Sequence, residues 1–271
     1  MIVKPNCKIN LGLNVIRKRM DGYHDIETVF YPSGLCDTLE ITASDDSRFH
    51  FSSSGLKIPG DSSLNLCIQA YELIREHFQI PAVNLHLQKA IPLGSGLGGG
   101  SSNAAFTLKA LNEMFRLGLN NVHLKAFALR LGSDCSFFIE NIAAFAKGRG
   151  EVLEKVSVNL SGLYLLIVIP QVHMSTGDAY TMIQPARPES SLKEIITLPV
   201  NQWKGKLVND FENAVCLKFP LICQIKDLLY EQGAVYSSMS GSGSAVYGLF
   251  NEIPAAEGLF PGCFVWVSSR L

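Results

Sequence analysis

Apolar and polar residues alternate along several stretches of the chain, which is typical of half-buried β-strands. Within "CKINLGLNVI", every second residue from Ile9 to Val15 is apolar. A turn at Asp21-Gly22 comes next, and the chain resumes as "DIETVFYP", so we expect a strand, a turn and a second strand. "DTLEI" and "AVNLHLQKAI" predict two further strands, the latter with one polar face.

Helical spacing follows in other segments. "SSLNLCIQAYELIREHF" has apolar residues one turn apart and predicts a helix, with Asp61, Ser62 or Ser63 as its cap. "SSNAAFTLKALNEMF" predicts an amphipathic helix that starts near Ser101 or Ser102. We also expect a helix in "VHLKAFALRLGSD", stopped by Gly132, and another over residues 219–232.

The second half of the chain predicts mainly strands and loops. "AAFAKGRGEVLEKV" is interpreted as a strand and a turn, and "LYLLIVIP" as a buried strand that Pro170 ends. "QPARPESSLKE" is expected to be an exposed loop, and "SSMSGSGSAVYGLF" a glycine turn that opens a strand. The mixture favours an α+β sandwich over a doubly wound parallel sheet, with a lobe boundary near residues 150–160.

Composition narrows the class of partner. The 271 residues are 47% hydrophobic and 17% charged, which indicates an ordered globular protein. The 23 basic and 24 acidic side chains nearly cancel, so charge gives no reason to expect nucleic acid or an anionic membrane as a partner. We expect a small-molecule substrate and a monomer or weak homodimer.

Cysteine usage and the termini suggest a cytoplasmic protein. The seven cysteines are odd in number, scattered and without a Cys-x-x-Cys pair, so we expect reduced, mostly buried thiols. The amino terminus lacks a signal-peptide pattern, and the longest apolar run, residues 163–170, is too short to span a bilayer. The six histidines form no close cluster, so no metal site built by the protein is expected.

The stretch "PLGSGLGGGSSN" places five glycines among nine residues directly before a predicted helix. Its letters satisfy the dinucleotide pattern G-x-G-x-x-G, but the preceding strand is half polar and a second helix follows the first, which opposes a Rossmann site. No Gly-Lys-Ser or Gly-Lys-Thr closes a Walker loop. The remaining interpretations are a flexible turn, or a loop whose backbone amides bind a phosphate at a helix amino terminus.

This glycine stretch resembles the phosphate loop of the GHMP kinases, which has the form Pro-x-x-x-Gly-Leu-Gly-x-Ser-Ser. "KINLGLNV" and "MSGSGSAVYGLF" are similar to the first and last motifs of that family, in the same order. Lys-x-Asn-Leu together with Asp-Gly-Tyr-His resembles the branch that acts in non-mevalonate isoprenoid-precursor synthesis. Small residues depart from the usual pattern at Cys7, Ser133, Cys135 and Ser136.

The resemblance implies a two-lobed α+β fold. The amino-terminal lobe, residues 1–155, would be similar to domain 2 of ribosomal protein S5, and the carboxy-terminal lobe, residues 156–271, would be ferredoxin-like. The implied reaction transfers the ATP γ-phosphoryl group to the 2-hydroxyl of a diphosphocytidyl-methylerythritol, with Mg²⁺ bound to the ATP and no metal held by the protein alone.

The resemblance also implies roles for individual residues. Asp134 would accept or orient the hydroxyl proton, and Lys8 would stabilise the transferring phosphoryl group. Tyr23 and His24 would read a cytosine base, while Asn10 would bind the substrate or orient Lys8. Phe30, Thr176 and Tyr180 are further substrate-pocket candidates, with simple packing an equal alternative for Tyr180. The ATP-binding candidates are Pro92, Leu93, Gly94, Ser95, Gly96, Leu97, Gly98, Gly99, Gly100, Ser101, Ser102 and Asn65.

Other functions stay open at this point. A homoserine, mevalonate or sugar kinase would use the same phosphate loop, although it would have no use for a cytosine-reading pair. A nucleotide-binding regulator without catalysis is a second alternative, which Lys8 and Asp134 oppose, and an NAD-dependent oxidoreductase is the third. "SGSGS", residues 240–244, would either close over the ligands or serve only as a strand-entry turn.

Overall fold

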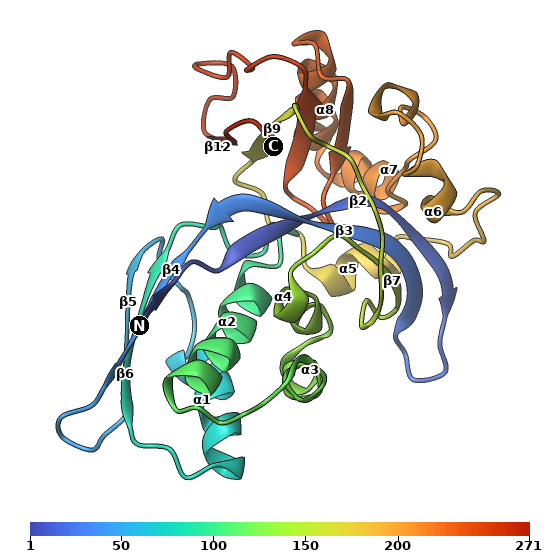
Figure 1. The fold of residues 1–271 in the computed structure, drawn as a ribbon. Helices are drawn as coiled ribbons and strands as arrows, with labels where there is room; N and C mark the ends of the chain where they lie inside the picture. The colour runs from blue at the N-terminus through green and yellow to red at the C-terminus, as the bar shows by residue number, and fades with distance from the viewer. The chain divides into compact units, whose positions relative to one another are not determined.

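The computed structural model describes residues 1–271 apart from the side chain of Ser62. The chain forms two compact units, each assembled from three separate stretches (Figure 1). Unit 1 comprises Met1–Cys7, Leu35–Leu93 and Gly98–Ile142. Unit 2 comprises Lys8–Gly34, Gly94–Leu97 and Ala143–Leu271.

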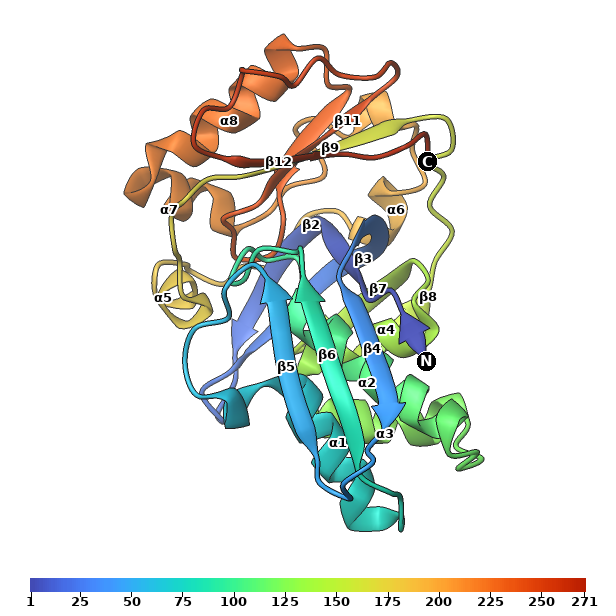
Figure 2. The same cartoon turned by 90° about the vertical axis from the view of Figure 1, so that its left-hand side faces the viewer.

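Unit 1 is a four-stranded sheet with helices on one face (Figure 2). The strand order is β1-β4-β6-β5, and β5 pairs parallel to β6 whereas the other pairs are antiparallel. Alternating residues of β6 face the buried side, as its sequence pattern predicts. The elements are β1 Ile2–Val3, β4 Thr38–Ala43, β5 His50–Gly55, β6 Val83–Lys89, α1 Leu66–His77, α2 Gly99–Met114, α3 Asn121–Leu131 and α4 Phe137–Glu140.

Unit 2 contains two antiparallel four-stranded sheets, ordered β2-β3-β7-β8 and β10-β11-β9-β12. Helix α8 packs on strands β10 and β11 of the second sheet, and its apolar face completes the core of this unit. The elements are β2 Asn6–Lys18, β3 His24–Cys36, β7 Ala144–Gly148, β8 Val152–Lys155, β9 Tyr164–Ile169, α5 Thr176–Thr181, α6 Leu192–Ile195, α7 Phe211–Lys218, α8 Pro220–Glu231, β10 Tyr236–Met239, β11 Val246–Phe250 and β12 Phe264–Val267.

The strands and helices predicted from periodicity are present, and the α+β class is confirmed. The first helix begins later than its pattern, at Leu66, because the side chain of Asn65 accepts a hydrogen bond from the Cys67 amide and caps it. Ser62, predicted as a possible cap, has a side chain outside the described residues. Helix α2 begins at Gly99, two residues before Ser101, so the glycine stretch itself supplies its first turn.

Several short elements have no counterpart in the predictions. β1, β5, α5, α6 and α7 are short or polar, and their apolar period is too brief to detect. Helix α6 begins inside the segment expected to be an exposed loop. The stretch "SSMSGSGSAVYGLF" forms an antiparallel hairpin, β10 and β11 around the glycine turn, rather than a turn opening one strand.

The prediction of reduced cysteines is wrong for one pair. Cys216 and Cys223 form a disulfide that links α7 to α8. A spacing of seven residues across a helix–helix junction carries no sequence signature of pairing, because two helices must fold back before the sulfurs meet. Among the described residues, the other five cysteines form no disulfide, and Cys7, Cys67 and Cys135 are buried as expected.

The two units interleave along the chain, so they do not follow a single cut in the sequence. The boundary between residues 155 and 156 therefore stays a prediction about lobes. Among the described residues, no helix has both the length and the apolar character needed to cross a bilayer.

A buried carboxylate organises unit 1 beneath the end of β6. Asp37 is fully buried, and its Oδ2 accepts hydrogen bonds from the ammonium of Lys89 and, at 2.8 Å, from Asn103 Nδ2. Its Oδ1 accepts from the amides of Ala90 and Ile91 at 2.7 and 2.8 Å. The carboxylate therefore joins strand β6, the chain that leads into the glycine stretch, and helix α2.

We expect Asp37→Asn to destabilise the protein by about 3–5 kcal/mol, because it leaves the Lys89 ammonium buried without its counter-charge. Urea unfolding measures the loss. Asp37→Asn combined with Lys89→Met should recover part of it, since the unpaired charge is then removed.

The matched control is Glu140→Gln, which breaks a partly exposed pair with Lys125 in the same unit. It should cost no more than about 1 kcal/mol, because solvent screens that pair. An Asp37→Asn variant as stable as Glu140→Gln would contradict the role assigned to the buried carboxylate.

Candidate functional site

The first turn of α2 provides a backbone anion site within unit 1. The earliest regular bond of the helix runs from the Ser102 amide to the Gly98 carbonyl at 2.9 Å, so the amides of Gly99, Gly100 and Ser101 precede it. Helix amino termini favour anions through such amides and through the helix dipole. The Ser102 hydroxyl is buried without a hydrogen-bond partner. An anionic, oxygen-rich ligand fits this set of donors.

Close packing explains one glycine of this turn. A Cβ on Gly99 would lie 3.0 Å from both the Ile91 side chain and Lys89 Nζ. The backbone of α2 therefore rests directly on the Asp37–Lys89 pair, and a side chain here would push the helix start away from its support. The glycine is required for this approach rather than for flexibility.

Asp134 lies in a short 3₁₀ helix, Ser133–Ser136, between α3 and α4 of unit 1. This short helix packs against α2, and the Cys135 thiol hydrogen-bonds with Ser101 in the first turn of α2. Burial raises the pKa of the Cys135 thiol to about 12, an effect that the hydrogen bond with Ser101 only partly opposes. Cys135 is therefore a neutral packing residue, whereas Asp134 beside it is partly exposed.

Lys8 is the centre of a second cluster, in unit 2. Only 3% of its surface is exposed, although an isolated strand lysine is usually solvated. Its Nζ donates to Asn10 Oδ1 and, at 2.9 Å, to the Gly96 carbonyl, and it lies 5.0 Å from the centre of the Phe30 ring. Asn10 is held in turn, because its Nδ2 donates to Thr28 Oγ1 at 2.9 Å. The ammonium therefore has a fixed position beside the glycine loop.

The glycine turn of the β10–β11 hairpin supports the Gly94–Leu97 part of the loop. The Ser240 hydroxyl donates to the Gly96 carbonyl at 3.0 Å, and the Ala245 amide donates to the Ser95 carbonyl at 3.0 Å. Gly96 has φ +78°, and a Cβ there would lie 2.1 Å from the Ser240 carbonyl oxygen, so no other residue fits. "SGSGS" thus contacts the loop and Asn10, besides forming the hairpin turn.

Aromatic candidates gather in unit 2. His24 stacks on Tyr180 with ring centres 4.6 Å apart, and Tyr180 packs edge-on against Phe211 at 4.9 Å. Burial, with a smaller contribution from the Lys18 charge, lowers the pKa of His24 below its ordinary 6.5. Tyr23 is 57% exposed, and the guanidinium of Arg149 covers its ring at 4.8 Å.

The remaining predicted residues have varied environments. Thr176 begins α5, and its hydroxyl lies 3.2 Å from that of Ser242 in the glycine turn. Phe30 is buried beneath the Lys8 ammonium. Asn65 caps α1, which explains its position without a ligand, so a contact with adenine stays a prediction. Leu93 is 42% exposed, whereas Leu97 is buried.

Three supporting residues belong to no motif or periodic pattern in the sequence. Asn209 Nδ2 donates to the carbonyls of Met239 and Gly241, both at 2.8 Å, and so holds the glycine turn. Thr28 orients Asn10, and Asp37 supports the phosphate-loop helix. The position of Lys89 could have been noticed in the sequence, because Lys89 continues the apolar alternation of Val83, Leu85 and Leu87. A lysine on a buried face needs a buried partner, so this pattern indicates a buried ion pair.

Each unit carries groups of the kinds that phosphoryl transfer uses. Unit 1 offers the amides and hydroxyls at the start of α2, together with the short helix that carries Asp134. Unit 2 offers a fixed ammonium at Lys8 and the aromatic pair His24 and Tyr180. Phosphoryl transfer needs positioned amides and cations more than it needs a covalent nucleophile.

Comparison with known proteins is consistent along the whole chain. The family model "GHMP kinases N terminal domain" matches residues 65–149, and "GHMP kinases C terminal" matches residues 197–264. The chain is 51% identical over 269 residues to the 4-diphosphocytidyl-2-C-methyl-D-erythritol kinase of Parabacteroides distasonis, covering 98% of both chains. It is 44% identical to the enzyme of that name from Porphyromonas gingivalis, covering 99% of both.

Solved structures show the same relationship. A crystal structure of 4-(cytidine 5'-diphospho)-2C-methyl-D-erythritol kinase matches with a TM-score of 0.82 and 30% identity, covering 98% of both chains. The mevalonate kinase of Methanococcus jannaschii shares the fold, with a TM-score of 0.70 and 15% identity, covering 100% of this chain and 98% of that one. By its family domains and its full-length relatives, this chain belongs to the GHMP kinase family.

Proposed function

We propose that this protein transfers the γ-phosphoryl group of ATP to the 2-hydroxyl of 4-diphosphocytidyl-2-C-methyl-D-erythritol, in the non-mevalonate route to isoprenoid precursors. The observation that carries the proposal is the full-length similarity to kinases of that name, at 51% identity. Similarity to the mevalonate kinase, at 15% identity, extends to the fold alone.

The chemistry of unit 1 supports ATP as the phosphoryl donor. The amides of Gly99 to Ser101 and the Ser102 hydroxyl, which has no partner among the described residues, suit phosphate oxygens. The hydroxyls of Ser101 and Ser102 would hold a phosphate-bound Mg²⁺. When bound, Mg²⁺ neutralises charge that develops on the phosphates. Gly94–Leu97, which belongs to unit 2, is proposed to bind phosphate oxygens as well.

The acceptor side rests on Lys8, Asp134 and the aromatic residues. Asp134 accepts or orients the proton of the attacking hydroxyl. The hydroxyl loses this proton as its oxygen bonds to the γ-phosphorus and the bond between that phosphorus and ADP breaks. Lys8, fixed by Asn10 and Gly96, stabilises the charge of the transferring group. His24, Tyr23 and Tyr180 recognise the cytosine, with Phe30 and Thr176 shaping the pocket. The aromatic faces provide stacking area, and a neutral imidazole offers one donor and one acceptor to the base edge.

A panel of acceptors tests the substrate directly. With ATP and Mg²⁺, we expect the purified protein to phosphorylate 4-diphosphocytidyl-2-C-methyl-D-erythritol at least about 10³-fold more efficiently in kcat/KM than homoserine, mevalonate or galactose, because only the cytidyl substrate satisfies base-reading groups. A coupled assay for ADP gives the rates. Preference for a non-nucleotide acceptor would overturn the proposed substrate.

Asp134→Ala should lower kcat by at least about 10²-fold while leaving the affinity for ATP largely unchanged, because the carboxylate acts on the acceptor hydroxyl rather than on the nucleotide. Steady-state rates and calorimetric titration with ATP separate the two effects. Asp45→Ala, which removes an exposed carboxylate of the same unit, is the matched control and should keep full activity. Full activity in Asp134→Ala would exclude the proposed role.

The environment of His24 predicts its titration. Because burial lowers the pKa of His24, its NMR titration midpoint should fall below 6.5, and the imidazole should be neutral at pH 7. His24 therefore binds a proton more readily in the unfolded chain than in the folded one. Its contribution to the free energy of unfolding declines as pH falls below 6.5. Tyr180→Ala exposes the His24 ring to solvent and should raise the pKa of His24 towards 6.5. A midpoint at or above 6.5 in the unaltered protein would refute this assignment.

A further inference from the structure

A series of buried hydrogen bonds leads from the Lys8 ammonium to the Gly12 carbonyl by way of strand β3. Lys8 Nζ donates to Asn10 Oδ1, and Asn10 Nδ2 donates to Thr28 Oγ1 at 2.9 Å. The Thr28 hydroxyl donates in turn to the Gly12 carbonyl at 2.5 Å. Lys8, Asn10 and Thr28 are at most 3% exposed, so solvent does not compete for these bonds. All four residues belong to unit 2.

The chemistry of these groups fixes the direction of every bond in the series. A hydroxyl carries a single proton and a carbonyl can only accept, so the Thr28 proton points to Gly12. The Thr28 oxygen can then only accept, which requires the Nδ2 end of the Asn10 amide. The opposite end, Oδ1, is therefore turned towards Lys8, whose ammonium can only donate. Thr28 thus selects the orientation of the Asn10 amide that gives the ammonium an acceptor.

Ser240 also reaches the Asn10 amide, but it does not select the orientation of that amide. The Ser240 Oγ lies 3.0 Å from the Gly96 carbonyl oxygen and 3.3 Å from Asn10 Oδ1, and it has one proton for the two. With its proton on Gly96, the hydroxyl would accept a bond from Nδ2 as readily as it approaches Oδ1. Ser240 therefore tolerates either orientation of Asn10, whereas Thr28 does not.

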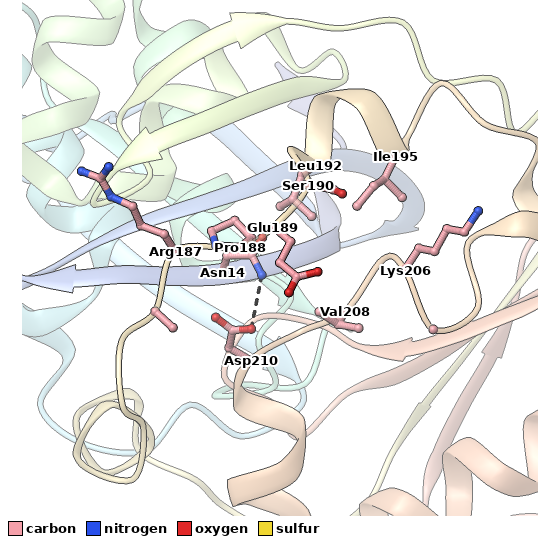
Figure 3. A pocket seen from close by; sticks show the side chains of 12 residues that line it. Asn14, Arg187, Pro188, Glu189, Ser190, Leu192, Ile195, Lys206, Val208 and Asp210 are labelled. Carbon is pink, nitrogen blue, oxygen red and sulfur yellow. Dashed lines mark hydrogen bonds between the residues drawn. The ribbon is translucent and has the colours of Figure 1, made fainter.

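The acceptor at the end of the series is held in place, because β2 is anchored directly after Gly12. The Leu13 carbonyl accepts from the Asp210 amide at 2.9 Å. The Asp210 carboxylate accepts from Asn14 Nδ2 at 3.2 Å, as the dashed line in Figure 3 shows. The two residues that follow Gly12 are thus bonded to a separate segment of unit 2. The Gly12 carbonyl is therefore a fixed point for the Thr28 proton.

We propose that Thr28 is a positioning residue of the phosphoryl-transfer reaction and acts on Lys8 through Asn10. Reversal of the Asn10 amide would set its N–H groups against the ammonium, and Lys8 would lose a bond that fixes it. A displaced ammonium stabilises the transferring phosphoryl group less, because this stabilisation depends on groups placed before the reaction begins. The catalytic part of the inference rests on the proposed function, whereas the control of Lys8 by Thr28 does not.

Replacement of the Thr28 side chain tests the inference. Thr28→Val removes the hydroxyl and should lower kcat about tenfold, the net contribution of one hydrogen bond, with each KM changed less than about twofold. Thr28→Ser keeps the hydroxyl and should retain kcat to within about twofold of the unaltered enzyme. Thr28→Cys, a weaker donor and acceptor, should lie between the two and replaces Thr28→Val if that variant does not fold.

Ser268→Ala is the matched control, because it also takes the acceptor from a buried N–H group of unit 2. Ser268 is 6% exposed, and its hydroxyl accepts from the Leu165 amide at 2.8 Å. This variant should lower the midpoint of thermal unfolding about as much as Thr28→Val but leave kcat unchanged. Full kcat in Thr28→Val, or equal loss in Thr28→Ser or in Ser268→Ala, would overturn the proposal.

The Lys8 ammonium provides a readout that needs no turnover. In protein labelled with ¹⁵N-lysine, Thr28→Val should shift the Lys8 Nζ signal and speed its hydrogen exchange at least about fivefold, because a bond that fixes the ammonium is weakened. Thr28→Ser and Ser268→Ala should leave the signal unchanged. If this pattern holds in a protein without the proposed kinase activity, the proposed function fails and the control of Lys8 by Thr28 stands. An unchanged signal in Thr28→Val would overturn that control whatever the substrate.

Discussion

The buried carboxylate of Asp37 is the constraint on which the rest of unit 1 depends. A charge with no solvent must be neutralised and fully hydrogen-bonded, and here one ammonium, one side-chain amide and two backbone amides do so. Each donor comes from a segment that leads into or out of the glycine stretch. The end of β6, the two residues that follow it and helix α2 are therefore held together by a single group.

Unit 2 achieves a similar order with neutral groups. Asn10, Asn209 and Ser240 connect β2, the glycine turn and the Gly94–Leu97 segment through amide and hydroxyl bonds. Lys8 contributes the charged group of this cluster, and its ammonium donates to a carbonyl and to an amide oxygen. These two bonds fix the position of the ammonium in unit 2.

Regular elements could be predicted because their period extends over several turns or pleats, as in β2, β6, α2 and α8. The candidate phosphate loop and the candidate catalytic residues were predicted from motifs whose letters are specific, and they stay predictions. The supporting polar groups could not be found in this way. Asp37, Asn103 and Asn209 are isolated letters, and their partners lie 52 or 66 residues away for Asp37 and 30 or 32 for Asn209.

The disulfide and the hydrogen bond between Asn14 and Asp210 show the same limit. Both arise where separate segments meet: α7 with α8 in one case, and β2 with the segment before α7 in the other. Residues 195–210, for which the sequence predicted no element, contribute Asn209 and Asp210 to these contacts. A segment without a recognisable motif can therefore still stabilise the fold.

The interleaving of the two units has a consequence for biosynthesis and for fragment studies. Unit 1 lacks its last stretch until residue 142 has been made, and unit 2 remains incomplete until the end of the chain. Neither can be cut out as one continuous polypeptide, and the peptide bond between Leu97 and Gly98 joins them inside the phosphate loop itself. Within unit 2, Gly96 waits for Ser240, which lies 144 residues further along the chain, and long-range pairing of this kind slows folding.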